Sequence, residues 1–347
     1  MKYTILILSL FLTSKAFSWG ARGHHAICAT AAFLVKEQGL KEYLKHKPQM
    51  MGHLCNIPDF YWKSLGPEIG KLGNPTHFVD VEVIGLKAEE IPTDYKKLIE
   101  TYTGTENKFK KEGAKIFSMP QEFGSSWWRA EQFLRRAFAL EKDFSTSTPP
   151  KDSKEEQKED LPFNKTAFEF VVNLGLMGHF VGDNAQPFHT SADYDGWEAG
   201  HGGIHAYYEE AVVGEFDGNL DALVLAEAKK MKSPSFLKPK TKIERMRALG
   251  AISFNEIPKI LKLDPIIKKS SLSKEKGMSL RTPAERKSAQ VGFQKMNKMI
   301  VTQMARAAVL LAHTWDEAYV QVGRPPLAKY KSYKYPFTPD FVAPDYH

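Results

Sequence analysis

The sequence predicts an all-α fold, a single compact multi-helix domain with long surface loops. Apolar residues recur at intervals of three and four residues along most of the chain, which is the spacing of one helix face. Few stretches alternate as strands do, and 42% of the 347 residues are hydrophobic, which is ample for a sizeable core. The segments with helical spacing are residues 26–38, 121–141, 165–186, 204–213, 220–231, 242–261 and 284–322.

The chain begins with the pattern of a secretory signal peptide. Lys2 precedes an apolar run at residues 5–12, and residues 16–18 (Ala-Phe-Ser) place small residues where a signal peptidase requires them. The run is far shorter than the roughly 20 residues of a membrane-spanning helix. We therefore expect residues 1–18 to be removed before Trp19. The mature protein would then be secreted or periplasmic, with no transmembrane segment.

Residues 19–330 are expected to form one domain. Residues 145–160 are charged, contain prolines and have almost no hydrophobic residues, which indicates a flexible surface insertion. The basic segment 268–282 is expected to be a loop, and residues 331–347 an irregular C-terminal tail with no predictable partner. The main candidate for extended chain is HFVDVEVI at residues 77–84.

The formal net charge of +7 falls to +5 without residues 1–18, because that segment contains two lysines and no acid. A basic protein favours a phosphate-bearing substrate or an anionic surface. A generally basic secreted protein is the alternative, and charge alone does not decide between them.

Cys28 and Cys55 are the only cysteines. In an exported protein an even number of cysteines favours a disulfide, whereas cysteine is also a common buried core residue. A disulfide between them and two buried thiols therefore both remain open.

Potential metal ligands are concentrated in residues 178–189, GHFVGDNAQPFH. His179 and Asp183 are four residues apart, so on a helix they lie on one face and can bind the same cation. Pro187 ends the helix, and His189 follows on the turn.

A second histidine and carboxylate pair has the same spacing. His205 and Glu209 are four residues apart, sixteen residues after His189. One zinc ion rarely needs so many ligands, so the two pairs together indicate more than one ion.

The segment WGARGH, residues 19–24, directly follows the expected cleavage site. A free α-amino group has a pKa of about 7.7 to 8.0, and it can chelate a metal together with the adjacent carbonyl oxygen of Trp19. His24 can supply a further ligand from the first turn of the following helix. The segment alone also fits a tryptophan packed at a helix start.

These motifs occur in an order that resembles a known superfamily. It joins zinc-dependent phospholipase C to the single-strand-specific nucleases of the S-one/P-one type. The matching features are WGARGH, Asp59, THFVD around His77, HFVGDNAQPFH and HAYYE at residues 205–209. The ordered match covers residues 19–209, and residues 296–322 resemble the closing helix of the family. The resemblance implies the all-α fold of that superfamily.

The resemblance also implies three zinc ions. The expected ligands of the first are Asp59, His77, His179 and Asp183. Those of the second are His189, His205 and Glu209. Those of the third are the amino nitrogen and carbonyl oxygen of Trp19, His24 and the other oxygen of Asp183. Asp59 is the expected catalytic residue, which would also orient the attacking water, and Asp80 is a nearby alternative ligand.

Such a site would make the protein a phosphodiesterase without a serine or cysteine nucleophile. Zinc lowers the pKa of bound water to about 7, so a hydroxide held between two zinc ions is available at neutral pH. It would attack phosphorus in line with the leaving oxygen.

The motifs resemble two branches of the superfamily that act on different substrates. Most resemble the nucleases, which typically carry tryptophan and aspartate where Tyr208 and Glu209 stand; HAYYE is closer to phospholipase C. The fungal nucleases carry an arginine three residues after the aspartate, whereas here Trp62 stands there, followed by Lys63. We expect an endonuclease acting on single-stranded DNA and RNA. The alternatives are a phospholipase C acting on phospholipid head groups and a non-catalytic, zinc-stabilised binding protein.

Aromatic and basic residues near the motifs are candidate substrate contacts, because bases stack on aromatic rings without sequence readout. In a lipase the same residues would contact the lipid. The candidates are Trp62, Lys63, Tyr194 and Trp197. No protein partner is expected.

Overall fold

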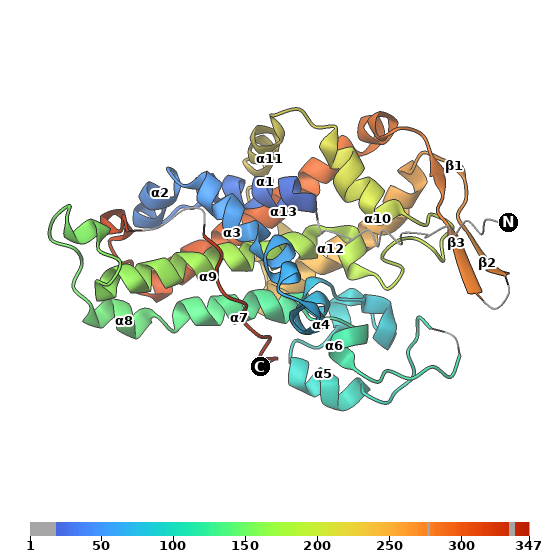
Figure 1. The fold of residues 1–347 in the computed structure, drawn as a ribbon, viewed down its shortest axis with the longest axis horizontal. Coiled ribbons are helices and arrows are strands. Elements are labelled where there is room, and N and C mark those ends of the chain that lie inside the picture. Colours follow the sequence, from blue (N-terminus) through green and yellow to red (C-terminus); the bar gives the residue numbers. More distant parts are fainter. Residues whose placement is uncertain (1–18, 111, 276–277, 333–336, 347) are drawn as a thin grey trace, which may run out of the picture.

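The computed structural model describes residues 19–110, 112–275, 278–332 and 337–346 (Figure 1). The expected signal peptide lies outside the described residues. The prediction of an all-α domain is confirmed, since helices form most of the described chain and its strands make only two small antiparallel ribbons. No helix in the described ranges is both long and apolar enough to cross a membrane.

The helices vary from one turn to nine turns in length. In chain order they are α1 (Gly20–Leu34), α2 (Gln38–Leu44), α3 (Pro48–Phe60), α4 (Pro67–Gly73), α5 (Tyr95–Tyr102), α6 (Met119–Glu122), α7 (Ser126–Phe138), α8 (Glu141–Thr146), α9 (Pro162–Ala185), α10 (Ile204–Ala206), α11 (Leu220–Ala228), α12 (Lys242–Leu263) and α13 (Ala289–Gln321). The strands are β1 (Ile266–Lys268), β2 (Ser271–Glu275), β3 (Met278–Thr282) and β4 (Glu285–Arg286).

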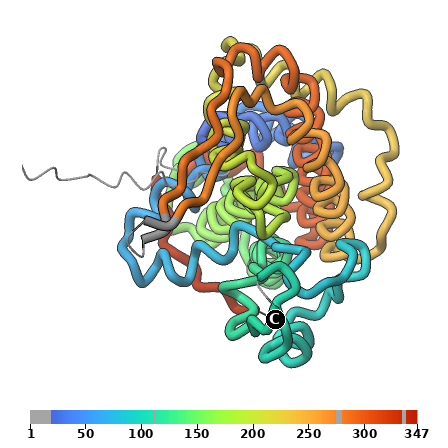
Figure 2. The backbone as a smooth tube through the Cα atoms, turned by 90° about the vertical axis from the view of Figure 1, so that its right-hand side faces the viewer, coloured from blue at the N-terminus to red at the C-terminus, as the bar shows by residue number. Residues whose placement is uncertain are grey.

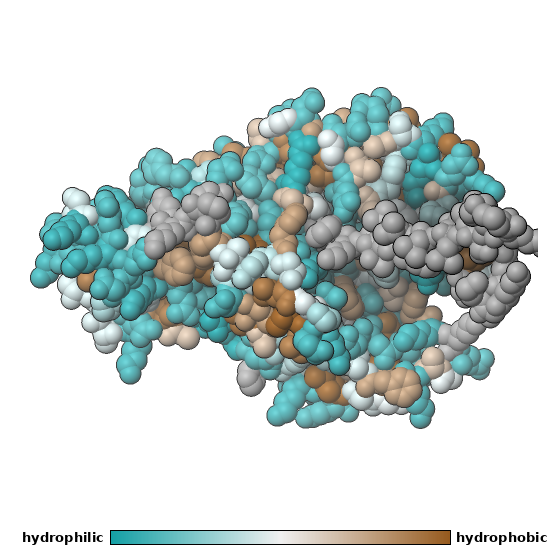
Figure 3. Space-filling view, in the orientation of Figure 1, coloured by the Kyte–Doolittle hydropathy of each residue, from teal (hydrophilic) through white to brown (hydrophobic). Residues whose placement is uncertain are grey.

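Helix α9 is the centre of the fold. It packs on α7, α3, α13 and α1, and in the view along the long axis it lies in the middle of the other helices (Figure 2). Every residue from 170 to 185 is buried, and a helix without a solvent-exposed face belongs in a core. The face of the molecule in Figure 3 is mainly hydrophilic, with small hydrophobic patches. Because residues 170–185 are all buried, the polar residues among them are shielded from water.

A disulfide between Cys28 and Cys55 joins α1 to α3, with a Cα–Cα distance of 6.3 Å. It decides between the two alternatives left open by the sequence. Gly178 of α9 makes room for it, because a Cβ there would lie 2.2 Å from the Cys28 sulfur. In the chain-entropy description, closing a loop of this length stabilises the fold by roughly 3–4 kcal/mol.

Two expectations about extended chain were wrong. Residues 77–84 form no strand: His77 ends one 3-10 turn and Val81–Ile84 form another, so the extended part is limited to the stretch between them, where Val79 makes an isolated bridge to Gly124. In contrast, the basic segment 268–282, expected to be a loop, forms β2 and β3.

The segment before α9 is attached to the helix by Asn164. Its side-chain amide donates to the carbonyls of Glu155 and Lys158, both at 2.8 Å, and the residue is 1% exposed. Asn164 begins an Asn-Lys-Thr sequence, and in the folded protein its side-chain amide is buried and hydrogen-bonded.

Residues 337–346 of the tail are irregular, yet they lie firmly against α3 and α7. The Trp62 indole donates to the Pro339 carbonyl at 2.9 Å, and the Phe341 ring packs edge-on against Trp62. The Gln132 amide donates to the Ala343 carbonyl at 2.8 Å. The tail therefore covers a surface that would otherwise expose large aromatic rings.

A buried cation lies beneath the tail. The Arg129 guanidinium is close to the rings of Trp62, Phe133, Phe180 and Phe341 and donates to the Val342 carbonyl. Burial lowers the pKa of Arg129 to about 9. A buried charge is costly unless it has partners. The tail supplies two of them, the Val342 carbonyl and the Phe341 ring, so Arg129 and the tail stabilise each other.

We expect Phe341→Ala to lower the free energy of unfolding by about 2 kcal/mol, because it removes a ring from a largely buried aromatic cluster. Urea unfolding of the purified protein measures this change. Phe117 is 82% exposed, so Phe117→Ala is the matched control, with an expected effect of about 0.5 kcal/mol or less. Equal effects of the two substitutions would contradict the role assigned to the tail.

Candidate metal centre

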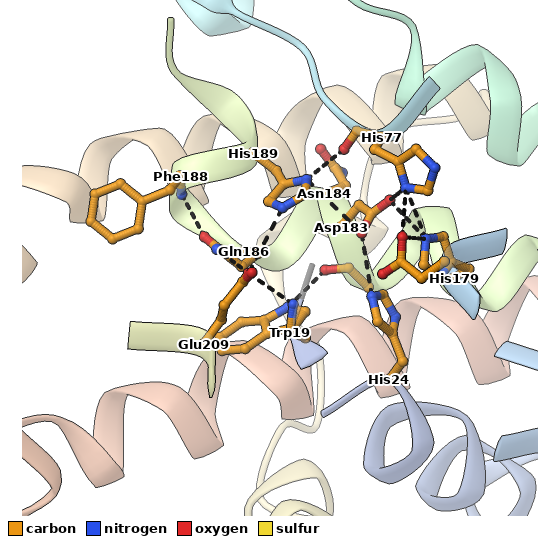
Figure 4. Close-up of polar contacts among 12 residues, drawn as sticks. Trp19, His24, His77, His179, Asp183, Asn184, Gln186, Phe188, His189 and Glu209 are labelled. Carbon is orange, nitrogen blue, oxygen red and sulfur yellow. Dashed lines mark hydrogen bonds and ion pairs between the residues drawn. The ribbon is translucent and has the colours of Figure 1, made fainter. Parts of the chain in front are cut away.

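Eight potential metal ligands from segments far apart in the sequence meet at one end of α9. Figure 4 labels His24, His77, His179, Asp183, His189 and Glu209 among them. Helix α9 presents His179 and Asp183 one turn apart on the same face, as their spacing predicted. All eight side chains are at least nine-tenths buried. They are His24 of α1, Asp59 of α3, His77, His179, Asp183, His189, His205 and Glu209.

These ligands form three buried groups, each of which can hold a metal ion. Within each group the ligand atoms lie within 4.8 Å of one another. The groups are His24 with Asp59 and His179, His77 with His179 and Asp183, and His189 with His205 and Glu209. The second group belongs to the first ligand set expected from the sequence, and the third group is the second set. The first group differs, because it joins His24 to Asp59 and His179.

Asp183 links the two sides of the centre. Its Oδ2 atom lies 3.1 Å from His77 Nδ1 and 3.4 Å from His179 Nε2. Its Oδ1 atom lies 3.4 Å from His24 Nε2 and 4.0 Å from His189 Nδ1. Burial alone would raise the pKa of Asp183, but the histidines around it hold the pKa well below its usual value. The carboxylate is therefore charged, and each oxygen faces different imidazoles.

Backbone carbonyls orient three of the imidazoles. The Nδ1 atoms of His179, His189 and His205 lie 2.8, 2.7 and 3.1 Å from the carbonyl oxygens of Cys55, His77 and Tyr194. An Nδ1–H that donates to a carbonyl leaves the Nε2 lone pair free for a metal. Burial lowers the pKa of His189 to about 3 and that of His179 well below its usual value, so both are neutral ligands at pH 7.

The centre contains buried polar atoms without hydrogen-bond partners among the described residues. They are both ring nitrogens of His24, Asp59 Oδ2, Asp183 Oδ1 and Glu209 Oε1. Such atoms are rare in folded proteins because burial costs them their bonds to water. Cations bound at the three groups would satisfy them, so the residues present fit metal ions.

Glu209 is held by two neutral donors and one imidazole. Its Oε2 atom accepts from the Trp19 backbone nitrogen at 2.9 Å and from the Gln186 amide at 2.8 Å, and it lies 3.0 Å from His205 Nε2. Burial lowers the pKa of His205, but Glu209 and other partners together raise it above the usual value. The π-helix Tyr207–Val212 carries this carboxylate, and such irregular turns are frequent at functional sites.

Trp19 is completely buried, and its indole donates to the Gly182 carbonyl at 2.9 Å. Its backbone is left-handed, with φ of 47°, which is unusual for a bulky residue. The backbone nitrogen thus lies at Glu209, an expected ligand of the second zinc. The Trp19 carbonyl accepts from Gly23 as the first hydrogen bond of α1, at 3.1 Å.

The metal centre opens into a groove of about 1170 Å³. His77, His189 and His205 form its floor, and Lys63 and Tyr194 are on its walls. The groove thus brings three largely buried ligand histidines together with a lysine and with Tyr194, which is 49% exposed.

The candidate substrate contacts fall into two classes. Lys63 and Tyr194 line the groove, and Lys63 Nζ lies 2.5 Å from Asp59 Oδ1. Trp62 and Trp197 do not line the groove. Trp62 is 3% exposed in the core beneath the tail, and the Trp197 indole is bonded to Asp195 and covered by Arg281. The groove therefore gives no support to a substrate contact at either residue, and that expectation stays a prediction.

Asp80 lies in the groove and is absent from the three ligand groups, whereas Asp59 belongs to one of them. Burial and the nearby charge of Glu82 raise the pKa of Asp80 well above its usual value. Gln186, whose amide donates to Glu209, was not among the expected site residues, although its place inside HFVGDNAQPFH was a usable signal.

Neither a scan of protein-family models nor a search of curated proteins gives a match to this chain.

A substitution at Gly182 tests whether His24 contributes to the metal centre. A Cβ there would lie 2.8 Å from His24 Nδ1, so we expect Gly182→Ala to displace His24 and lower the metal content by about one ion per chain, because one ligand group loses its histidine. Elemental analysis measures the metal content. Gly214→Ala is the control, because no atom lies within 4 Å of its added Cβ. An unchanged metal content in Gly182→Ala would exclude this role of His24.

Proposed function

We propose that this protein is a zinc-dependent phosphodiesterase, a nuclease that hydrolyses single-stranded DNA and RNA. The observation that carries the proposal is the set of three adjoining, buried ligand groups at the floor of an open groove. Adjoining metal sites of this kind suit the displacement of an oxygen at phosphorus.

The donor set favours zinc over magnesium or calcium. It combines five imidazoles with three carboxylates, whereas magnesium and calcium are harder cations that prefer oxygen ligands. Bound zinc would supply Lewis acidity and a water of lowered pKa.

The residues of the chain have distinct roles in this proposal. Asp59 has one oxygen beside Lys63 and another without a hydrogen-bond partner. Asp59 would use this second oxygen as a metal ligand and would also orient the attacking water towards phosphorus. Lys63 places a positive charge in the groove, where it can stabilise negative charge on a phosphoryl oxygen. The two cysteines form a disulfide, so they offer no nucleophile.

The groove also suits a nucleotide strand. Phe78 and Tyr194 line it together with Lys63 and Lys71. An aromatic ring contributes about 1–3 kcal/mol per stacked base, and lysines bind phosphates without reading sequence. This combination supports single-stranded nucleic acid as the substrate.

A phospholipase C is the second candidate, and Glu209 favours it. The sequence HAYYE is closer to that branch of the resemblance, although Tyr208 is buried and donates to Gln303 at 2.6 Å. Tyr208 thus supports the fold beneath the site and does not contact a substrate.

Zinc-loaded protein is expected to degrade single-stranded DNA and RNA and to leave phosphatidylcholine vesicles intact. Gel electrophoresis and phosphate release measure the two activities. Degradation of lipid alone would overturn the nuclease assignment. No turnover of any substrate would assign the chain to a non-catalytic, zinc-stabilised binding protein.

Lys63→Ala is expected to lower kcat about 100-fold, since removal of one preorganised donor to a developing charge costs about that much. Lys63→Arg should recover part of the rate, and the metal content should remain that of the original protein. Lys71→Ala is the control for general loss of positive charge in the groove. Equal rates for Lys63→Ala and Lys71→Ala would contradict the specific role of Lys63.

Removal of metal with a chelator at pH 7 is expected to lower the midpoint of thermal unfolding by at least about 10 °C. Three buried carboxylates then lose their cations, and one unpaired buried group alone costs about 1–3 kcal/mol. Readdition of zinc should restore the midpoint. A midpoint that does not respond to the chelator would show that the centre holds no metal.

A further inference from the structure

The ribbon of β2 and β3 has apolar side chains on both faces. Leu272 pairs with Arg281, and Ser273 pairs with Leu280. Directly paired residues share a face of an antiparallel ribbon, and successive pairs point to opposite faces. Leu272 and Leu280 therefore lie on opposite faces, and they are 54% and 42% exposed. A ribbon that packed on the protein would bury one of them.

The ribbon lies at the right-hand edge of the molecule in Figure 1, and its two strands have their main contacts with each other. A two-stranded ribbon alone is only marginally stable in water. This ribbon is held at its base, where Arg286 bonds to Asp264 at 2.9 Å and to the Gly202 carbonyl at 3.0 Å. Asp264 also lies 2.8 Å from His201 Nδ1. The base is therefore firmly attached, while Leu272 and Leu280 beyond it remain exposed on the two faces.

The ribbon and its flanks are strongly basic. Residues 266–287 contain seven Lys or Arg residues and two Glu residues, a formal charge of +5 within a chain of +7. Lys268, Lys269 and Arg281 are exposed, as is Ile267 at 59%. Positive charge and exposed apolar side chains thus occur on the same short element.

We propose that the β2–β3 ribbon binds the surface of an anionic phospholipid bilayer. Leu272 and Leu280 enter the headgroup region from the two faces of the ribbon, and Lys268, Lys269 and Arg281 contact lipid phosphates. Binding by an interfacial element depends on buried apolar area together with attraction to anionic lipids, and this ribbon supplies both. A nucleic acid would bind the basic residues, but it offers no apolar environment for leucines on both faces of the ribbon.

Binding would also orient the groove. The Ser270 amide donates to the Gly200 carbonyl at 3.0 Å, and Arg281 lies over the ring of Trp197. The loop that these contacts hold continues to His205 at the groove floor. The ribbon therefore places the groove close to the bilayer, whichever phosphodiester the groove accepts.

Flotation of the purified protein with vesicles tests the proposal. We expect binding to vesicles of phosphatidylcholine mixed with phosphatidylglycerol and weak binding to phosphatidylcholine alone. The double substitution Leu272→Ser and Leu280→Ser should weaken binding at least about tenfold, because both apolar contacts are lost. Lys268→Ser should weaken it about fivefold, since one basic residue at an anionic surface contributes about 1 kcal/mol.

Leu223→Ser is the matched control, because Leu223 is 40% exposed on α11. It should bind vesicles like the original protein. All variants should hydrolyse a soluble phosphodiester at the original rate, so a failure of vesicle binding is distinguishable from a failure of the proposed activity. The proposal is overturned if the original protein does not bind the mixed vesicles, or if the double variant binds them as well as the original protein does. Weakened binding of single-stranded DNA, with no vesicle binding by any variant, would assign the ribbon to nucleic acid.

Discussion

The interaction on which the structure depends is the burial of three carboxylates among five imidazoles at the end of α9. Asp59, Asp183 and Glu209 are each no more than 2% exposed, and burial of unpaired charge is among the costliest events in folding. Asp183 has histidines on both of its oxygens, yet one oxygen has no hydrogen bond. Cations bound among these ligands would offset this cost and would connect segments from α1 to the π-helix at Glu209.

The packing around α9 makes this concentration of charge possible. Gly178 leaves space for the disulfide between α1 and α3, and Gly182 leaves space for the ring of His24. These two glycines bring the helices that carry His24 and Asp59 close to α9. The glycines of GHFVGDNAQPFH are therefore as necessary to the centre as its ligands, although they bind nothing.

Two pairs of candidate ligands could be predicted from the sequence because a helix fixes the relation between positions four residues apart, whereas Asp59 and His77 were expected only from the resemblance. His179 with Asp183 and His205 with Glu209 follow this rule, and the structure places each pair together. The Cys28–Cys55 pair remained open in the sequence, because local spacing does not show how closely α1 approaches α3.

The features that could not be predicted from the sequence depend on contacts between distant segments. Trp62 resembled a substrate contact, but its exposure is decided by the tail, whose Pro339 and Phe341 cover it. The ribbon of β2 and β3 resembled a loop because its residues are polar and basic. Its strands pair with each other, so they need no apolar face directed at the core.

Anomalous X-ray scattering at the zinc absorption edge, from crystals of protein purified with zinc, tests the central claim most directly. The account predicts anomalous peaks inside the buried centre, one at His189 with His205 and Glu209 and at least one more among His24, Asp59, His77, His179 and Asp183. Peaks confined to the protein surface, or a buried centre without any peak, would contradict it.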